Sequence, residues 1–553
     1  MGTSSEVPQA QPPGAAKPQQ FYARKATGLV RQVPMLDMIF FNANSTTAFT
    51  GALAVGLFVV MPAFPRANIL LTIVLGIVGC TFIWMSFALL GAAIPKVGGD
   101  YVFNGRILHP IFGLAGNLGA FVAAWLAAGF WAVAVVKAGI APAFGIVGVT
   151  TGNHWWINAG NTLSEKGWVF VIAITTVAVM TLLSILGTKL VMRAQSIFYL
   201  VTCVGGLLAF VILLFMSRAS FVSHLNSFSR PFTHQSNTYQ ATIHTAVKGG
   251  LKLPDRAGGY STGNTLGAIY PIIGAAIMWV WWGVYLAAEM KGGGRRNRQL
   301  TGIFGAGFGQ GLLVLIGAAI FFKTIGYDFF AAANANSYGV PVAPYFGFFA
   351  AIGVHSNLVA ILISFAVIFA FPPAVYINLA MCQRAPFAWA WDGLAPQWLT
   401  KVSDRYHTPV PAILVTFALC VATTAWAAFS TSFATIFTIF TLCGFVTIGI
   451  TGLAAVTMAW RRPELYRGSA ADWKVLGIPV LPVAGVGTLA FTALMVVEAI
   501  RFRAALGVSS LAELLGPPIG VIVVGAVYYL GARAFQNRRG IDLDLAYKTI
   551  PPD

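Results

Sequence analysis

Twelve apolar stretches, each about as long as a lipid bilayer is thick, constrain this chain more than any other feature of its sequence. A helix needs roughly 20 apolar residues to cross the hydrocarbon core of a membrane. Charged residues make up only 9% of the chain, whereas a soluble globular protein carries about a quarter. The sequence therefore predicts an all-α integral membrane protein with twelve transmembrane helices, which begin near Met35, Asn68, Phe112, Trp168, Ser196, Leu266, Thr301, Asn357, Pro411, Phe433, Pro479 and Gly516.

The basic residues predict the orientation of these helices. The formal net charge is +18, and most Lys and Arg residues fall in connections on the same side of the membrane as the N-terminus. Short cytoplasmic loops of helical membrane proteins carry such an excess. Both termini are therefore expected in the cytoplasm, with the protein spanning the cell (plasma) membrane, and the charge does not indicate nucleic-acid binding.

The chain is expected to form one membrane domain with flanking tails. Residues 1–34 are polar, rich in Pro and Gln, and lack the apolar core of a signal peptide, so they predict a disordered cytoplasmic tail. Residues 35–460 would hold ten core helices, residues 461–537 helices eleven and twelve, and residues 538–553 a second cytoplasmic tail. On the opposite side, residues 218–265 predict a solvated loop and residues 327–356 predict short helices over a vestibule. The amphipathic stretch after Gly98 and Gly99 is expected to lie at the membrane interface.

Two of the apolar stretches are interrupted in the middle. The stretch 35–61 carries a polar run, and the stretch 266–288 carries Gly274 and Gly283 on either side of a Trp-rich segment. In lipid every backbone amide needs a partner, so unwound backbone persists only where it lines a cavity. Broken helices in corresponding positions of two halves of a membrane protein indicate a solute site near the bilayer midplane. The pattern favours a secondary transporter.

Four connecting segments resemble signatures of the amino acid-polyamine-organocation (APC) superfamily. Residues 93–101 contain Pro-Lys-Val-Gly-Gly-Asp-Tyr, which resembles the Pro-x-x-Gly-Gly-x-Tyr signature. Residues 187–198 resemble the passage that joins helices four and five, and residues 288–297, with Ala-Glu-Met-Lys and Arg-Arg-Asn, resemble the segment after helix six. Residues 384–409, with Trp-Asp-Gly-Leu-Ala-Pro and His-Thr-Pro, resemble the passage after helix eight. The resemblance covers roughly residues 35–460.

The resemblance implies a fold and a kind of site. Members of the superfamily have a LeuT-like five-plus-five inverted repeat with broken helices one and six, plus two peripheral helices. They hold the substrate carboxylate against unwound backbone in helix one and the amine near unwound backbone in helix six. Half-helix ends suit both groups, because an N-terminus offers N–H groups to an anion and a C-terminus offers carbonyls to a cation.

Carried onto this chain, the break in helix one falls on Ser45, Thr46 and Thr47, preceded by Asn42 and Asn44. Both glycines of the family's Gly-Ser-Gly pattern are replaced, which stiffens the backbone. The hydroxyl and amide groups could bind a substrate or an ion. Alternatively, they could bond between packed helices, as polar residues do in membrane bundles.

The break in helix six falls on a Trp-rich segment whose candidate site residues are Ile277, Met278, Trp279, Trp281 and Trp282. Trp279 stands where the family commonly has glycine, unless the register shifts to Gly283. The three indoles predict a stacking wall for an apolar or cationic side chain. The alternative is an aromatic belt at the membrane interface.

Candidates for coupling or gating are fewer. Many proton-linked or exchange-type relatives carry a Lys in helix five, and that position falls at or near Thr202. Lys137 is an ionisable residue at membrane depth, so it is either functional or extends to water. Tyr376 and Asn378 in helix eight are further pocket candidates, with packing as the simpler interpretation. The coupling ion, proton or sodium, stays open.

Together these patterns predict a secondary active transporter of a neutral or aromatic α-amino acid that works by alternating access. A carrier of polyamines or other organic cations, and a non-transporting solute sensor with the same fold, are the alternatives. No catalytic, metal-binding or phosphate-binding motif is recognised, so neither an enzyme nor a cofactor is expected. The expected partners are a small-molecule substrate and the lipid bilayer, with no nucleic acid, and the oligomeric state stays open.

Overall fold

The computed structural model describes residues 29, 31–45, 47–53, 57–256, 258–335, 338–354, 356–430 and 433–548. It is 78% helical, and 11 helices of this described part are long and apolar enough to cross a membrane. They correspond to the second to twelfth apolar stretches of the sequence. The first stretch, which is broken into helices too short to cross a membrane, is not among them. The prediction of an all-α membrane protein is confirmed.

The first half of the chain builds the broken segment and four long spans. Its elements are α1 (Met35–Asn44), α2 (Ala48–Ala52), α3 (Phe58–Ala63), α4 (Ile69–Ala93), α5 (Asp100–Ile107), α6 (Pro110–Ala134), the π-helix η2 (Val135–Ile140), α7 (Ala141–Thr151), α8 (His154–Leu163), α9 (Lys166–Leu186), α10 (Thr188–Phe215), α11 (Arg218–Thr233) and α12 (Thr238–Lys248). Of these, α6, η2 and α7 form one continuous apolar span, Pro110–Thr151.

The second half contains the other interrupted segment, formed by α13, α14 and η4. Its elements are η3 (Pro254–Arg256), α13 (Thr262–Gly267), α14 (Ile269–Ala276), η4 (Met278–Leu286), α15 (Arg296–Thr324), α16 (Tyr327–Ala335), α17 (Phe346–Ile352), α18 (Asn357–Ile368), α19 (Phe371–Trp391), η5 (Gln397–Thr400), α20 (Val410–Phe429), α21 (Phe433–Arg461), α22 (Pro463–Tyr466), β1 (Lys474–Val475), β2 (Ile478–Pro479), α23 (Val480–Arg501), α24 (Leu511–Arg538) and α25 (Leu543–Lys548).

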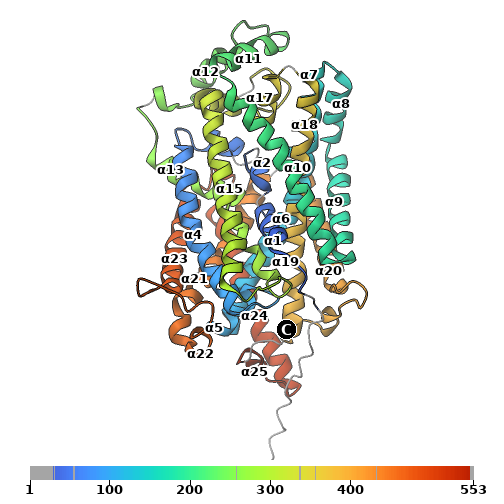
Figure 1. Cartoon of the computed structure of the whole chain (residues 1–553), viewed down its shortest axis with the longest axis vertical. Helices are drawn as coiled ribbons and strands as arrows, with labels where there is room; N and C mark the ends of the chain where they lie inside the picture. The colour runs from blue at the N-terminus through green and yellow to red at the C-terminus, as the bar shows by residue number, and fades with distance from the viewer. Residues whose placement is uncertain are drawn as a thin grey trace, which may run out of the picture.

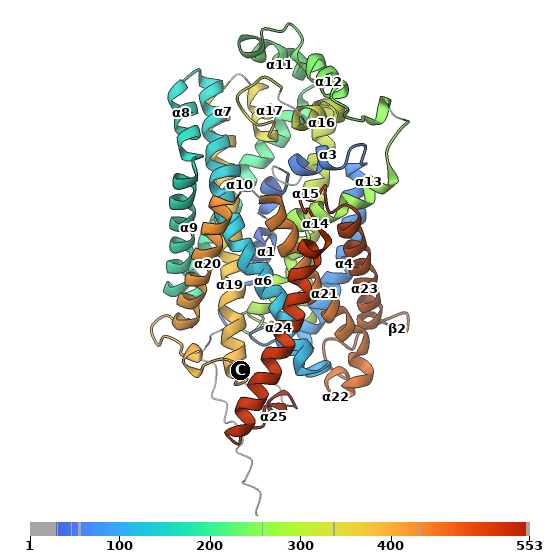
Figure 2. The same ribbon diagram turned by 180° about the vertical axis from the view of Figure 1, so that it is seen from behind.

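The long helices run along one axis and form a bundle (Figure 1). One end of the bundle carries α5, α22 and α25 and is called here the C-terminal end. The other end carries α11, α12 and α17, as Figure 2 also shows from behind. The segments α1 and η4 lie inside the bundle, where α1 contacts α10, α15, α19 and η4.

Turn residues place the helix ends where the sequence signals predict them. Asn68 caps α4, because its side chain accepts a hydrogen bond from the Leu71 amide at 3.1 Å. Pro110 occupies the first turn of α6, where its missing N–H costs nothing. Gly187, at φ 131°, separates α9 from α10 in a conformation that favours glycine.

The segment after helix two differs from the sequence-based expectation of an amphipathic stretch at the membrane interface. All eight residues of α5 are buried, and α5 packs against α6 and α21. Gly98 and Gly99 have φ values of 96° and 48°, so the chain turns back into the bundle there. A Cβ atom on Gly99 would lie 2.9 Å from the Val284 side chain, so this turn also allows a close approach to η4.

Three connecting or terminal segments carry more structure than a loop or tail. Residues 218–265, which predicted a solvated loop, hold α11, α12, η3 and the start of α13. Residues 327–356 hold the short helices α16 and α17, as predicted. Within residues 538–553, α25 packs against α24 and α5, and its Tyr547 side chain is 3% exposed.

Candidate functional site

The first break lies between α1 and α2. Ser45 follows α1 in a turn, and Thr47 adopts a left-handed conformation at φ 61° before α2 begins. A branched residue rarely adopts this conformation, so the break is specified by its surroundings rather than by glycine. The Ser45 hydroxyl donates to the carbonyl of Asn42 at 2.5 Å and satisfies one freed backbone group. Thr46 lies outside the described residues.

The two asparagines of α1 bond to neighbouring helices. Asn42 Nδ2 donates to the Gly302 carbonyl of α15 at 3.0 Å. Asn44 Nδ2 donates to Gln195 of α10, at 2.7 Å to Oε1 and 3.1 Å to the backbone carbonyl. Their amide N–H groups thus have the interhelical packing role that the sequence left open as an alternative. Both Oδ1 atoms are buried without a hydrogen-bond partner in the described part of the chain, so each has unused acceptor capacity.

The second break separates α14 from η4. Ile277 leaves the helical conformation with φ −141° and ψ −15°, and η4 then continues as a 3₁₀-helix of 9 residues. Runs of 3₁₀-helix longer than about four residues are uncommon and often mark a hinge or a strained segment. All nine residues of η4 are buried, so the irregular backbone is enclosed by protein rather than exposed to lipid.

The indoles of η4 form a buried aromatic cluster. Trp279 and Trp282 stack with ring centroids 5.3 Å apart and an interplanar angle of 8°, and Trp281 stacks on Phe87 of α4 at 4.0 Å. Trp279 Nε1 donates to the Gly274 carbonyl at 2.8 Å. Trp281 Nε1 is buried with no partner in the described residues, so it remains a free donor.

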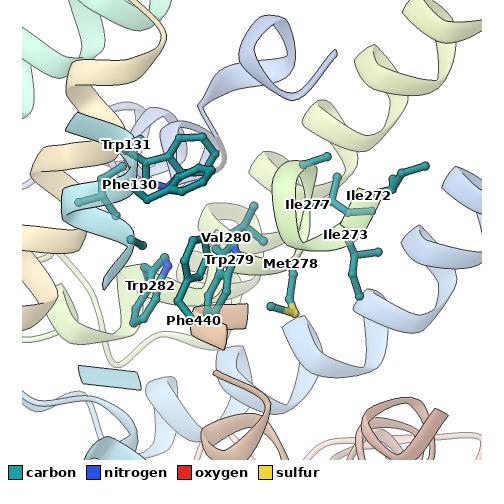
Figure 3. Packing of buried hydrophobic residues seen from close by; sticks show 14 of the residues in the cluster. Phe130, Trp131, Ile272, Ile273, Ile277, Met278, Trp279, Val280, Trp282 and Phe440 are labelled. Atoms are coloured by element: carbon teal, nitrogen blue, oxygen red, sulfur yellow. The ribbon is translucent and has the colours of Figure 1, made fainter. Parts of the chain in front are cut away.

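Aromatic side chains from other helices surround this cluster. Figure 3 shows Trp279 and Trp282 beside Phe440 of α21, with Phe130 and Trp131 of α6 nearby. The Phe130 and Phe440 rings lie 5.5 Å apart, and Trp279 and Phe440 lie 6.1 Å apart. The three indoles therefore pack in the bundle interior, away from a membrane-interface belt.

The helical segments beside the two breaks, α1 and η4, meet at Gly283. A Cβ atom on Gly283 would lie 2.5 Å from Asn42 Oδ1 and 3.0 Å from the sulfur of Met38, closer than real side-chain contacts allow. The backbone of η4 therefore packs directly on the polar turn of α1. Only glycine permits this approach. The packing therefore explains why position 283 is a glycine, which the sequence alone does not.

The remaining candidate residues lie in different surroundings. Thr202 on α10 shares a hydrogen bond of 2.8 Å with Thr50 of α2. The Tyr376 ring packs edge-on against Phe41 of α1 at 6.0 Å, while Asn378 donates to the Ala374 carbonyl of its own helix at 2.7 Å. Lys137 lies in η2 with an exposed side chain, which fits an extension to water better than a role in the buried site. Ile277 and Met278 are buried beside the break.

Charged pairs that the sequence interpretation did not assign lie toward the C-terminal end. Glu289, just after η4, accepts from Arg384 Nε of α19 at 2.8 Å and from the Thr188 hydroxyl of α10 at 2.9 Å. A second pair joins Arg106 of α5 to Asp392 at 2.8 Å. All four charged side chains of these two pairs are buried.

The C-terminal segment completes this cluster. The Tyr547 hydroxyl hydrogen-bonds the Tyr101 hydroxyl at 2.6 Å, and Tyr101 donates to Asp392 Oδ2 at 2.8 Å. The Arg106 guanidinium lies 4.7 Å from the centre of the Tyr547 ring. Burial raises the pKa of both tyrosines. We call Asp100, Tyr101, Arg106, Glu289, Arg384, Asp392 and Tyr547 the C-terminal network.

Asp100 is the unpaired acid of the C-terminal network. Its Oδ1 accepts hydrogen bonds from Tyr285 of η4 and from Asn117 of α6, the latter at 3.1 Å. Its Oδ2 is buried without a hydrogen-bond partner in the described residues. Burial raises the pKa of Asp100 to about 7, and the bonds from Tyr285 and Asn117 offset only part of that effect.

Sequence motifs marked most of the C-terminal network but not its role. Asp100, Tyr101, Glu289, Arg384 and Asp392 fall in three of the four connecting segments that carry the family resemblance. The signal was the recurrence of charged residues in those segments. Tyr547 lies outside these motifs, in residues 538–553, for which the sequence predicted only a cytoplasmic tail.

The buried breaks within a bundle of long apolar helices point to a membrane transporter. The sequence model of the amino acid permease family matches residues 40–509, which include both breaks and all four motif segments. The chain therefore belongs to the amino acid permease family, and the suspected membership of the APC superfamily is confirmed. None of the curated proteins matches the chain.

Proposed function

We propose that this permease is a secondary active transporter that moves a neutral or aromatic α-amino acid across the cell membrane by alternating access. The single observation that carries the proposal is the contact of the two segments beside the breaks, where Gly283 of η4 packs against Asn42 of α1. Irregular backbone inside a membrane bundle is tolerated where it serves a binding cavity.

We further propose that residues 35–460 form a LeuT-like five-plus-five inverted repeat, with α23 and α24 as the peripheral helices. Interruptions in the first and the sixth apolar segment support this arrangement. In it, α1 and η4 would move against a scaffold that includes α6 and α19. Residues 1–34 would be a cytoplasmic tail, and both termini would face the cytoplasm, as the distribution of Lys and Arg supports.

The substrate class follows from the chemistry around the breaks. Neither Asp nor Glu occurs in residues 38–53 or 269–288, so a cationic side chain would lack a counter-charge there. The free acceptors Asn42 Oδ1 and Asn44 Oδ1 suit an ammonium group. The stacked rings of Trp279 and Trp282 suit an apolar or aromatic side chain.

Uptake by the purified protein in proteoliposomes tests the proposal. Labelled phenylalanine, leucine, lysine, a polyamine and a nucleobase form the substrate panel, each with an imposed proton or sodium gradient to identify the coupling ion. We expect uptake of a neutral or aromatic amino acid. Uptake of the polyamine alone would establish an organic-cation carrier, and binding without uptake would establish a sensor.

Gly283→Ala tests the junction itself. The added Cβ would overlap Asn42, and overpacking of this kind costs about 1–3 kcal/mol. We expect the uptake rate to fall at least tenfold. Gly309→Ala is the matched control, since no atom lies within 4 Å of a Cβ at that position. Equal uptake by the two variants would remove the junction from the transport mechanism.

A further inference from the structure

A surface at the C-terminal end, outside the proposed amino acid site, has properties that transport does not require. It consists of a groove lined by residues 294–298 and 468–470 and the adjoining β1–β2 hairpin. The groove has a volume of about 560 Å³. It lies where α15 and α23, two of the candidate membrane spans, begin.

The groove is strongly basic. Arg295, Arg296 and Arg298 line it, and none of the three forms a salt bridge within the described residues. Arg296 lies 4.9 Å from the ring centre of Trp473, which connects the groove to the hairpin. The neighbouring acid, Asp472, accepts a hydrogen bond from the Gly468 amide at 3.3 Å. The groove therefore carries an excess of positive charge.

The hairpin next to the groove exposes apolar side chains at its tip. Lys474 pairs with Pro479 and Val475 with Ile478, so Leu476 and Gly477 form the two-residue turn. Leu476 is 97% exposed and Ile478 is 57% exposed. Figure 2 shows β2 projecting sideways from the bundle beside α23, across the direction of the membrane-spanning helices.

Leu476 is also an unfavourable residue for this turn. Leu476 and Gly477 both have positive φ, 50° and 80°, as in the type I′ hairpin turn. Asn or Asp normally takes the first of these positions, because a bulky L-residue is strained there. Exposure to water does not offset the backbone strain at Leu476, whereas burial of its side chain among acyl chains is favourable in free energy.

We propose that this surface binds an anionic phospholipid, with the headgroup phosphate in the arginine groove and the Leu476 tip inserted among the acyl chains. Guanidinium groups bind phosphate through paired, charge-assisted hydrogen bonds. Basic clusters beside membrane spans attract the anionic lipids of the cytoplasmic leaflet. The site adds lipid recognition to the proposed transport function and does not depend on the identity of the transported substrate.

Titration of the detergent-purified full-length protein with phosphatidylglycerol and phosphatidylcholine, followed by native mass spectrometry, tests the site. We expect the first phosphatidylglycerol to bind the wild type at least tenfold more tightly than phosphatidylcholine. The variant Arg295→Gln/Arg296→Gln/Arg298→Gln should lose this preference. The control Lys401→Gln/Arg405→Gln/Arg538→Gln removes the same charge from exposed residues at the same end and should keep it.

Leu476→Asn tests the hairpin separately. Asparagine suits the left-handed turn, so the variant should fold as well as the wild type while losing the apolar tip. We expect several-fold weaker binding of phosphatidylglycerol with an unchanged melting temperature. Equal losses in the two triple variants would overturn the proposal, as would displacement of the lipid by inorganic phosphate at the same concentration, which would identify a site for a free anion.

Discussion

The two breaks and the C-terminal network are both buried and polar, but they differ in charge. Around the breaks, Asn42 Oδ1, Asn44 Oδ1 and Trp281 Nε1 have no partner within the described residues, and residues 38–53 and 269–288 contain neither Asp nor Glu. In the C-terminal network, both ion pairs are closed by direct contacts of 2.8 Å. Uncharged donors and acceptors beside the breaks can bind a ligand, whereas the ion pairs of the network join segments of the chain. Asp100 Oδ2, Arg106 Nε and Arg106 Nη1 of the network also lack a partner within the described residues.

This difference separates the expected effects of substitutions. Changes in the C-terminal network should act mainly on stability, because its ion pairs join separate elements. Arg106 of α5 bonds to Asp392 after α19, and Glu289 after η4 bonds to Arg384 of α19 and to Thr188 of α10. Changes beside the breaks should act mainly on substrate affinity. Each of the following predictions would weaken the comparison if it failed.

The largest effect is expected for Arg384→Gln. The substitution leaves Glu289 as a buried charge without its cation, and breaking such a pair costs about 3–5 kcal/mol. The thermal melting temperature of the purified protein should therefore fall sharply. The double variant Glu289→Gln/Arg384→Gln removes both charges and should recover much of the loss. Equal melting temperatures for the single and double variants would contradict a paired role.

The next effect is a pH dependence that arises from Asp100. Its pKa is raised to about 7 in the folded protein, whereas an unfolded Asp titrates near 3.9. At pH values between these two pKa values the folded state binds more protons than the unfolded state. The free energy of unfolding therefore falls as the pH rises, by up to about 1.4 kcal/mol per pH unit. Asp100→Asn stays neutral and should lack this slope.

Melting temperatures of the wild type and Asp100→Asn between pH 5 and pH 8 measure that difference. The wild type should lose stability relative to the variant as the pH rises toward 7. Parallel curves would show that Asp100 is not a buried titrating group in the folded protein.

A smaller effect is expected beside the second break, for Trp282→Phe. The phenyl ring keeps the side chain aromatic but offers a substrate less aromatic surface, and an aromatic contact is worth about 0.5–1.5 kcal/mol. The apparent affinity in uptake assays should fall between twofold and tenfold, and the weaker stacking with Trp279 should lower the melting temperature modestly. Trp398→Phe is the control, because Trp398 is exposed. A loss of stability without a loss of affinity would place Trp282 in the packing alone.

The positions of the breaks could be predicted from the sequence because unusual local composition marks them. A dense polar run and a cluster of three Trp residues are unusual inside apolar spans, and both mark the irregular backbone that the structure contains. The bonding of the asparagines was left open, because Gln195 and Gly302 are distant in sequence and only the packing of α10 and α15 brings them close. The residues proposed to bind substrate stay predictions.

The burial of α5 could not be predicted for a different reason. Asp100, Asn104 and Arg106 read as a polar interfacial segment, yet each finds a buried partner on another element. A hydropathy scale includes the free energy needed to remove these side chains from water, but not the free energy gained from their hydrogen-bond and ion-pair partners. The same limit applies to Gly283, whose importance depends on the distant side chain of Asn42.

The smallest expected effect is that of Tyr547→Phe, which tests whether the C-terminal segment belongs to the network. The substitution removes the hydrogen bond to Tyr101, but Tyr101 keeps its bond to Asp392 and the ring stays beside Arg106. The loss should therefore be about 0.5 kcal/mol, the low end for a hydrogen bond. Tyr547→Ala also removes the buried ring and should cost about 3–5 kcal/mol. If both variants melt like the wild type, α25 does not contribute to closing the C-terminal end, and the network stops at Arg106 and Asp392.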